Sequence, residues 1–106
     1  MAHGMTALPD KSGEARAVEI RVTGRVQGVG FRYFVHETAR RLQLVGYVMN
    51  VRDGAVRAYA EGVTANLEAF IAAVSRGPAG ASVHDVRIHR GPATGNYTTF
   101  SIRPTL

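Results

Sequence analysis

The chain has 106 residues, of which 45% are hydrophobic and 20% charged, a composition typical of one small globular domain and unlike that of a disordered tail. Its lack of cysteine excludes disulfides and cysteine-ligated metal sites, and it contains no apolar run near the roughly 20 residues that a membrane helix requires. The net charge of +5 favours anionic partners of some kind. We therefore expect a cytoplasmic, single-domain protein.

The chain begins with a segment that is polar, small and aperiodic. We expect residues 1–17 to form a flexible leader and residues 18–106 to form the folded domain. The domain opens with VEIRVT, residues 18–23, where apolar and polar residues alternate with the period of a strand. The buried face of this strand is predicted to carry Val18, Ile20 and Val22.

From Phe31 the period of the pattern changes from that of a strand to that of a helix. Apolar residues recur every three or four positions until Leu42, which predicts one amphipathic helix with a single buried stripe. The members of the stripe are Phe31, Phe34, Val35, Thr38, Ala39 and Leu42. The strand and this helix are joined by the segment GRVQGVGFR, residues 24–32.

Two further strands are predicted next, in VGYVMNV (residues 45–51) and AVRAYAEG (residues 55–62). Asp53 and Gly54 between them form a strong hairpin signal, so the two strands are expected to be antiparallel neighbours. Asn50 is unusual at its position, because asparagine is depleted in strand interiors and is costly when buried without partners. Asn50 could simply cap the turn at the end of its strand, or it could have a chemical role.

A second helix and two more strands complete the pattern. Thr64 is a candidate N-cap and Gly77-Pro78 a stop signal for the helix. Its buried stripe is predicted to consist of Leu67, Phe70, Ile71 and Val74. Strands are predicted over 83–88 and around 97–102. The order β-α-β-β-α-β plus a terminal strand predicts an α+β fold, a ferredoxin-like two-layer sandwich with both helices on one face of a mainly antiparallel sheet.

The segment GRVQGVGFR places three glycines and an arginine between the first strand and the first helix. Glycine adopts positive φ at no steric cost, so such a loop can turn several backbone N–H groups toward one point. The first turn of the helix adds unpaired N–H donors, and Arg32 adds a guanidinium that can bind two phosphate oxygens. The pattern predicts an anion site, although an ordinary glycine-rich connector beside a surface arginine has the same sequence features. The segment lacks the lysine of a P-loop, which disfavours nucleotide binding.

GRVQGVGFR and the later segment GYVMNVRDGAV, residues 46–56, together resemble the two signature segments of the acylphosphatase family. The resemblance extends from about Val18 onward, and both segments match at the positions that the family pattern fixes. It implies a ferredoxin-like fold and hydrolysis of the carboxyl–phosphate bond of acyl phosphates without a metal or other cofactor. It also implies that Arg32 is the phosphate-binding catalytic arginine and that Asn50 orients the attacking water. The implied phosphate cradle consists of the backbone amides of Gln27, Gly28, Val29, Gly30 and Phe31.

A small-molecule acyl phosphate is therefore the expected partner, with no nucleic acid, no membrane and no metal, and we expect a monomer. Two alternatives stay open. The first is an RNA-binding module, because such domains share the βαββαβ order, but the strand at 55–62 has one aromatic residue, Tyr59, and lacks the aromatic RNA-binding run. The second is a non-catalytic domain that binds an anion in the same loop. No motif identifies the acyl group of the substrate.

Overall fold

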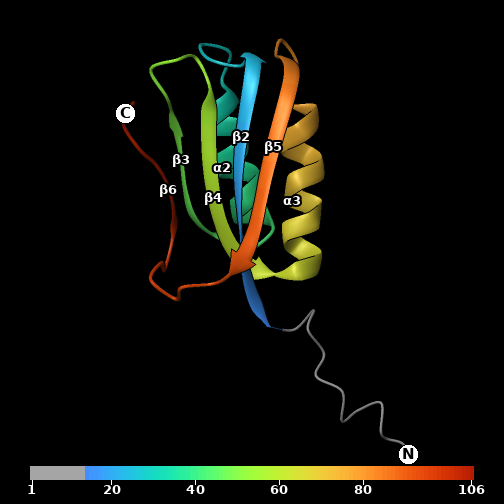
Figure 1. Ribbon diagram of the computed structural model, residues 1–106, viewed down its shortest axis with the longest axis vertical. Helices are drawn as coiled ribbons and strands as arrows, with labels where there is room; N and C mark the ends of the chain where they lie inside the picture. Colours follow the sequence, from blue (N-terminus) through green and yellow to red (C-terminus); the bar gives the residue numbers. More distant parts are fainter. Residues whose placement is uncertain (1–13) are drawn as a thin grey trace, which may run out of the picture.

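The computed structural model describes residues 14–106. This part of the chain consists of two helices and five strands in the predicted order (Figure 1). The elements are β2 (Ala15–Arg25), α2 (Phe31–Arg41), β3 (Val45–Asn50), β4 (Val56–Val63), α3 (Thr64–Arg76), β5 (Ser82–Pro92) and β6 (Phe100–Ile102). Neither helix of this described part is long and apolar enough to cross a membrane.

The strands form one five-stranded sheet in the order β5-β2-β4-β3-β6. Neighbouring strands are antiparallel except for β3 and β6, which run parallel. Figure 1 shows both helices packed on the same face of the sheet. The chain thus forms the predicted α+β two-layer sandwich of the ferredoxin-like type, and the prediction of the fold class is confirmed.

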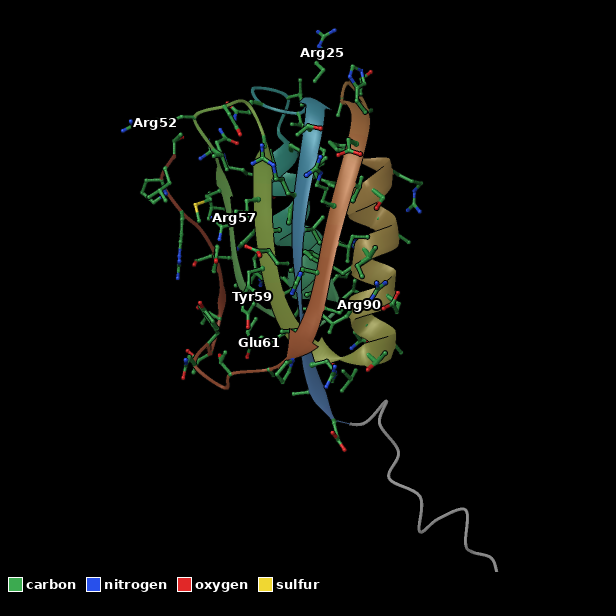
Figure 2. All side chains as sticks on the ribbon, viewed as in Figure 1. Arg25, Arg52, Arg57, Tyr59, Glu61 and Arg90 are labelled. Carbon is green, nitrogen blue, oxygen red and sulfur yellow. The ribbon has the colours of Figure 1, made fainter. Side chains whose placement is uncertain are left out.

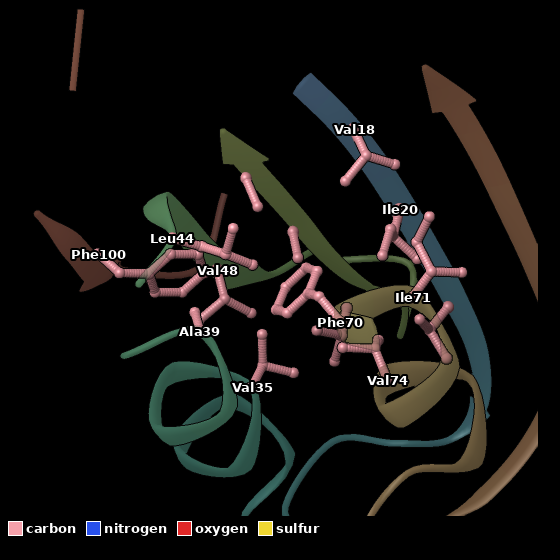
Figure 3. Packing of buried hydrophobic residues seen from close by; sticks show 14 of the residues in the cluster. Val18, Ile20, Val35, Ala39, Leu44, Val48, Phe70, Ile71, Val74 and Phe100 are labelled. Carbon is pink, nitrogen blue, oxygen red and sulfur yellow. The ribbon is translucent and has the colours of Figure 1, made fainter. Parts of the chain in front are cut away.

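The hydrophobic core fills the space between the sheet and the two helices (Figure 3). The residues of β2 that were predicted to be buried, Val18, Ile20 and Val22, are at most 1% exposed. They belong to one cluster with the apolar stripes of α2 and α3, where Val35 and Phe70 are completely buried. Burying one such side chain contributes about 1.5–3 kcal/mol relative to leaving it in water. The two layers therefore stack because the strand period and the helix period direct apolar residues into the same interior.

The strand β2 begins earlier than the sequence predicts. Residues 15–17, which the pattern assigns to the leader, pair with β4, and two of them also pair with β5 on the other side. Backbone hydrogen bonds to neighbouring strands hold this segment extended, although its side chains show no apolar alternation. The strand thus starts three residues before the boundary predicted at Val18. The rest of the predicted leader, residues 1–13, lies outside the described residues.

The start of the second helix also differs from the prediction. The N-cap of α3 is Val63, which makes no side-chain hydrogen bond to the helix, and Thr64 is the first helical residue. The predicted cap at Thr64 is therefore wrong. The reason is that β4 passes directly into α3, so the residue before the helix still has the extended conformation of the strand. The predicted buried stripe of this helix is confirmed, and its C-cap is Gly77.

The last strand is shorter than the predicted span 97–102 and covers only Phe100–Ile102. The residues before it are held on the sheet face that lies away from the helices. There the centroid of the Tyr97 ring lies 5.4 Å from that of Tyr59 and 5.9 Å from that of Tyr47. Tyr97 therefore packs over the sheet and does not extend its edge.

Glu61 is a buried carboxylate on this same face, and it fastens the loop that precedes β6 (Figure 2). It accepts hydrogen bonds from the Tyr59 hydroxyl, from the backbone N–H and hydroxyl of Thr94 at 2.8 Å and 2.7 Å, and from the Gly95 N–H at 3.1 Å. Burial alone raises the pKa of Glu61, but these hydrogen bonds outweigh it and hold the pKa below its usual value of 4.5. Burial, together with the bond to Glu61, raises the pKa of Tyr59 to about 12.

We expect Glu61→Gln to lower the melting temperature at neutral pH by about 10 °C, because hydrogen bonds to a charged group contribute about 1.5–3 kcal/mol and 1 kcal/mol corresponds to about 4–8 °C in such a domain. Since folding lowers the pKa of Glu61, its contribution is complete above the usual value of 4.5 and is lost as the pH falls through the lower folded value. The difference in melting temperature between the wild type and Glu61→Gln should therefore become smaller as the pH falls, which melting curves recorded from neutral to acidic pH will measure.

The matched control for this prediction is Glu68→Gln. Glu68 accepts two hydrogen bonds from Arg90, but both side chains are about half exposed, where an ion pair contributes at most about 1 kcal/mol to stability. The control should shift the melting temperature only slightly. A difference between Glu61→Gln and the wild type that stays constant from neutral to acidic pH would contradict the prediction.

Candidate active site

The loop between β2 and α2 curls because two of its glycines adopt left-handed backbone conformations. Gly28 has a φ of 75° and Gly30 a φ of 76°. An added Cβ would meet nothing within 4 Å at either position, so the backbone conformation, and not a lack of space, requires glycine there. Gly30 is also the N-cap of α2, and no side chain caps this helix. The N–H groups of its first turn are therefore donors without a capping acceptor, at the positive end of the helix dipole.

A cavity of about 210 Å³ opens beside this loop. Its lining residues are Val26, Gly28, Gly30, Phe31, Arg32, Tyr33, Asn50 and Ile102. Arg32 and Asn50, which belong to different elements of the fold, thus lie at one cavity together with the two loop glycines. Among the other predicted cradle residues, Phe31 lines the cavity, whereas Gln27 and Val29 do not. The loop and the β3–β4 turn lie at the end of the sheet where Arg25 and Arg52 are labelled in Figure 2.

Arg32 is held in place from two directions. The preceding residue, Phe31, is 2% exposed and anchors the first turn of α2 in the core. At the other end of the side chain, Nη1 of Arg32 donates to the backbone carbonyl oxygen of Arg103 at 3.5 Å. Because this hydrogen bond is long and uses one of five guanidinium N–H donors, the others can bind an anion in the cavity. No local signal in the sequence predicts this contact between residues 71 positions apart.

The chain after β6 continues alongside β3, directly after Ile102, which lines the cavity. The Arg103 N–H donates to the carbonyl of Val48 at 2.8 Å, and the Leu106 N–H donates to that of Asn50 at 3.1 Å. The guanidinium of Arg103 lies over the ring of Tyr47, 3.9 Å from its centroid, in a cation–π contact. These contacts hold the segment in place and leave the backbone of Asn50 bonded independently of its side chain.

Gln27 ties the glycine loop to the β3–β4 turn through its side chain. Its Nε2 donates to the carbonyl oxygens of Val51 at 2.7 Å and Ala55 at 2.9 Å. This contact adds to the backbone role expected of Gln27. In the same turn, Asp53 accepts a hydrogen bond from the Ala55 N–H at 3.0 Å and pairs with Arg21. The bond from Ala55 first, and that from Arg21 second, hold the pKa of Asp53 below its usual value.

The cavity combines backbone N–H donors, a guanidinium and a carboxamide. Within residues 14–106, its lining includes no carboxylate and no histidine. In the same part of the chain, no group of three or more His, Cys, Asp or Glu residues is arranged to hold a metal ion. Such a set of groups suits the binding of a phosphate-like anion by charge and by hydrogen bonds. It can position the anion and stabilise its negative charge.

Comparisons with known proteins agree with this geometry. The family model for acylphosphatase matches residues 18–102. Acylphosphatases from Syntrophotalea carbinolica and Salinibacter ruber are 43% and 45% identical, over 81% and 88% of this chain and 94% and 98% of their own lengths. The crystal structure of the acylphosphatase from Bacillus subtilis is 40% identical and superposes with a TM-score of 0.80, over 83% of this chain and 98% of its own. The chain therefore belongs to the acylphosphatase family.

Proposed function

We propose that this chain hydrolyses acyl phosphates to a carboxylate and inorganic phosphate in the cavity lined by Arg32 and Asn50. The observation that carries the proposal is that these two residues, from α2 and β3, line one cavity together with Gly28 and Gly30. Arg32 and the backbone amides of residues 27–31 hold the phosphate, and of that range Gly28, Gly30 and Phe31 line the cavity itself. Asn50 orients the attacking water. Membership of the acylphosphatase family supports this reaction.

The chemistry of the substrate makes this reaction possible with few catalytic groups. An acyl phosphate is a mixed anhydride of a carboxylic acid and phosphoric acid. Water attacks the phosphorus atom, a new oxygen–phosphorus bond forms, and the bond to the acyl oxygen breaks as the carboxylate leaves with its electron pair. Because carboxylic acids have a pKa of about 4, the leaving group is stable as an anion at neutral pH and needs no general acid.

The residues of the cavity supply the remaining requirements, which are positioning and charge stabilisation. Arg32 can present two parallel N–H donors to the phosphate oxygens, and the curled loop adds backbone N–H groups. The carboxamide oxygen of Asn50 accepts a hydrogen bond from the water, whose proton passes to the phosphate group of the substrate itself. The absence of a carboxylate or histidine from the described lining residues supports this route for the proton. The proposal involves no metal and no other cofactor.

The RNA-binding alternative is disfavoured by the packing of the aromatic rings on the sheet. The rings of Tyr47 and Tyr59 stack at 5.6 Å, and Tyr97 packs against both. The Tyr59 hydroxyl donates to the buried Glu61. RNA-recognition sheets instead need aromatic faces that are free to stack on bases. The three tyrosine rings of this face are already engaged with one another.

The decisive test is the loss of ultraviolet absorbance of benzoyl phosphate when the purified chain acts on it in the presence of excess chelator. Hydrolysis well above the buffer rate supports the proposal. Binding of inorganic phosphate without hydrolysis would overturn it in favour of a non-catalytic anion-binding domain. A salt-dependent gel shift with RNA and no hydrolysis would overturn it in favour of an RNA-binding module. We also propose that the chain is a monomer, which size-exclusion chromatography of the same sample tests. We further propose a cytoplasmic location.

The side chain of Gln27 should affect phosphate binding through the loop that it holds. We expect Gln27→Met to weaken competitive inhibition by inorganic phosphate several-fold, because the loop loses both bonds to the β3–β4 turn. Both carbonyls keep a backbone donor, Gly54 N–H for Val51 and Val51 N–H for Ala55. The loss of the two side-chain hydrogen bonds should nevertheless lower stability by about 1–3 kcal/mol, since one such bond contributes about 0.5–1.5 kcal/mol. Inhibition assays and melting curves measure the two effects.

Asn66→Leu is the matched control for Gln27→Met. It removes another hydrogen bond from a side-chain amide to a backbone carbonyl, which the Asn66 side chain donates to Leu42 at 3.0 Å. Asn66 and Leu42 do not line the cavity. The control should lose stability and keep its affinity for phosphate. If Gln27→Met binds phosphate as tightly as the wild type, the hydrogen bonds of the Gln27 side chain to the β3–β4 turn contribute to stability alone.

A further inference from the structure

Part of the active-site cavity is apolar and has no role in holding phosphate. Among residues 14–106, the exposed large hydrophobic residues are Tyr33 at 64%, Ile88 at 37%, Ile102 at 43% and Leu106 at 69%. Two of them, Tyr33 and Ile102, line the same cavity as Arg32 and Asn50. Exposed apolar groups that gather at a binding cavity commonly contact an apolar part of the ligand.

Packing of the fold does not account for Tyr33. The buried residues of α2 are Phe31, Val35, Thr38 and Ala39, and Tyr33 lies outside this stripe in the first turn of the helix. It lines the same cavity as Arg32, the residue that is proposed to bind phosphate. A polar residue would serve the helix surface equally well at this position.

Ile102 is exposed for a different reason. It is two residues after Phe100 in β6, so its side chain lies on the same face of the sheet as the buried Phe100. Phe100 is 6% exposed, whereas Ile102 is 43% exposed and lines the cavity. The helix-facing side of β6 is therefore buried at Phe100 and exposed at Ile102, where the cavity lies.

We infer that Tyr33 and Ile102 form the binding surface for the acyl group and that the enzyme prefers acyl phosphates with a compact apolar acyl group over acetyl phosphate. This inference rests on the proposed function. The phosphate occupies the polar part of the cavity, at the glycine loop and Arg32, and the acyl group lies against the two exposed side chains. The cavity of about 210 Å³ is smaller than the roughly 300–1,000 Å³ of sites for drug-sized ligands. It suits a phosphate with a benzoyl-sized or branched aliphatic acyl group and not a nucleotide.

The test compares kcat/KM for benzoyl phosphate with kcat/KM for acetyl phosphate in the wild type, Tyr33→Ser and Ile102→Ser. We expect the wild type to favour benzoyl phosphate. Each substitution to serine should lower the ratio of kcat/KM for benzoyl phosphate to kcat/KM for acetyl phosphate by about tenfold, the lower end of the range for an apolar contact, because the site is partly open. Inhibition by inorganic phosphate, which has no acyl group, should be unchanged. Tyr33→Phe removes only the hydroxyl and keeps the aromatic ring. It should keep the wild-type ratio if the ring is the part of Tyr33 that contacts the acyl group.

Ile88→Ser is the matched control, because Ile88 is also an exposed apolar residue but does not line this cavity. Its ratio should equal that of the wild type. An unchanged ratio in both Tyr33→Ser and Ile102→Ser, in enzymes that still hydrolyse both substrates, would overturn this inference alone. Hydrolysis of neither substrate by the wild type would instead overturn the proposed function, and this inference with it.

Discussion

Replacing Arg32 with alanine is expected to lower kcat/KM for an acyl phosphate by about 10³–10⁵-fold, the range found when an arginine that stabilises phosphoryl transfer is removed. In the proposed mechanism Arg32 contacts the phosphate in the bound substrate as well as in the transition state, so KM should rise while kcat falls. Steady-state kinetics with benzoyl phosphate measures both parameters. Competitive inhibition by inorganic phosphate should weaken in parallel, because phosphate uses the same guanidinium.

Two further variants separate the possible causes of such a loss. Arg32→Lys keeps the positive charge but loses the planar pair of donors, and it should recover only a small part of the activity. Arg41→Ala removes an exposed arginine from the last turn of the same helix, outside the cavity, and should leave the kinetics unchanged. Activity of Arg32→Ala within about tenfold of the wild type would be too high for a group that stabilises the transition state.

Replacing Asn50 with alanine should have the second-largest effect and a different kinetic form. We expect kcat to fall by about 10²–10³-fold, as when one preorganised hydrogen-bonding group is removed from an active site. KM and inhibition by phosphate should change little, because a group that orients water makes its main contribution in the transition state. The backbone of Asn50 pairs with Val56 in the sheet and accepts a bond from Leu106, so removal of the side chain should leave the strand intact.

The control for this prediction is Asn96→Ala. Asn96 is exposed in the loop before β6 and does not line the cavity, so its removal should not affect kcat. If Asn50→Ala keeps more than about a tenth of the wild-type kcat, the side chain does not orient the water. Such a fall in kcat would be smaller than the one expected when a preorganised hydrogen-bonding group is removed. A rise of KM equal to the fall of kcat/KM would assign Asn50 to substrate binding instead.

The separation of these two effects follows from where the two residues stand in the fold. Arg32 lies in the first turn of α2, beside the backbone donors that are proposed to bind the phosphate. Its loss should therefore weaken every state in which phosphate is bound. Asn50 is the last residue of β3 and lines the cavity from the sheet, whereas Gly28 and Gly30 line it from the loop before α2. Its proposed contribution therefore concerns the attacking water more than the phosphate.

Much of the local structure could be predicted from the sequence because it depends on short-range patterns. The change from a period of two to a helical period separated β2 from α2, and the stripe of α2 lay where the spacing of its apolar residues indicated. Asp53 and Gly54 marked the hairpin between β3 and β4. The glycines at 28 and 30 indicated a loop with positive φ, and both have it. Each of these features depends on residues within a few positions of one another.

The boundaries that differed were decided by partners far along the chain. Residues 15–17 are extended because β4 and β5 pair with them, and Tyr97 leaves the sheet edge because it packs against Tyr47 and Tyr59. Glu61 is buried because Thr94 and Gly95 supply its donors. No local pattern records such contacts.

The sequence by itself therefore determined the elements and their order, and it indicated the family and the candidate residues of the proposed anion site. Only the tertiary structure decided that Arg32 and Asn50 line one cavity, that the Arg32 guanidinium lies 3.5 Å from the Arg103 carbonyl, and that Tyr33 and Ile102 line the same cavity. The physical reason is that backbone conformation and periodic burial are set by near neighbours. A binding site is instead set by how the sheet pairs strands from distant parts of the chain, here β6 with β3.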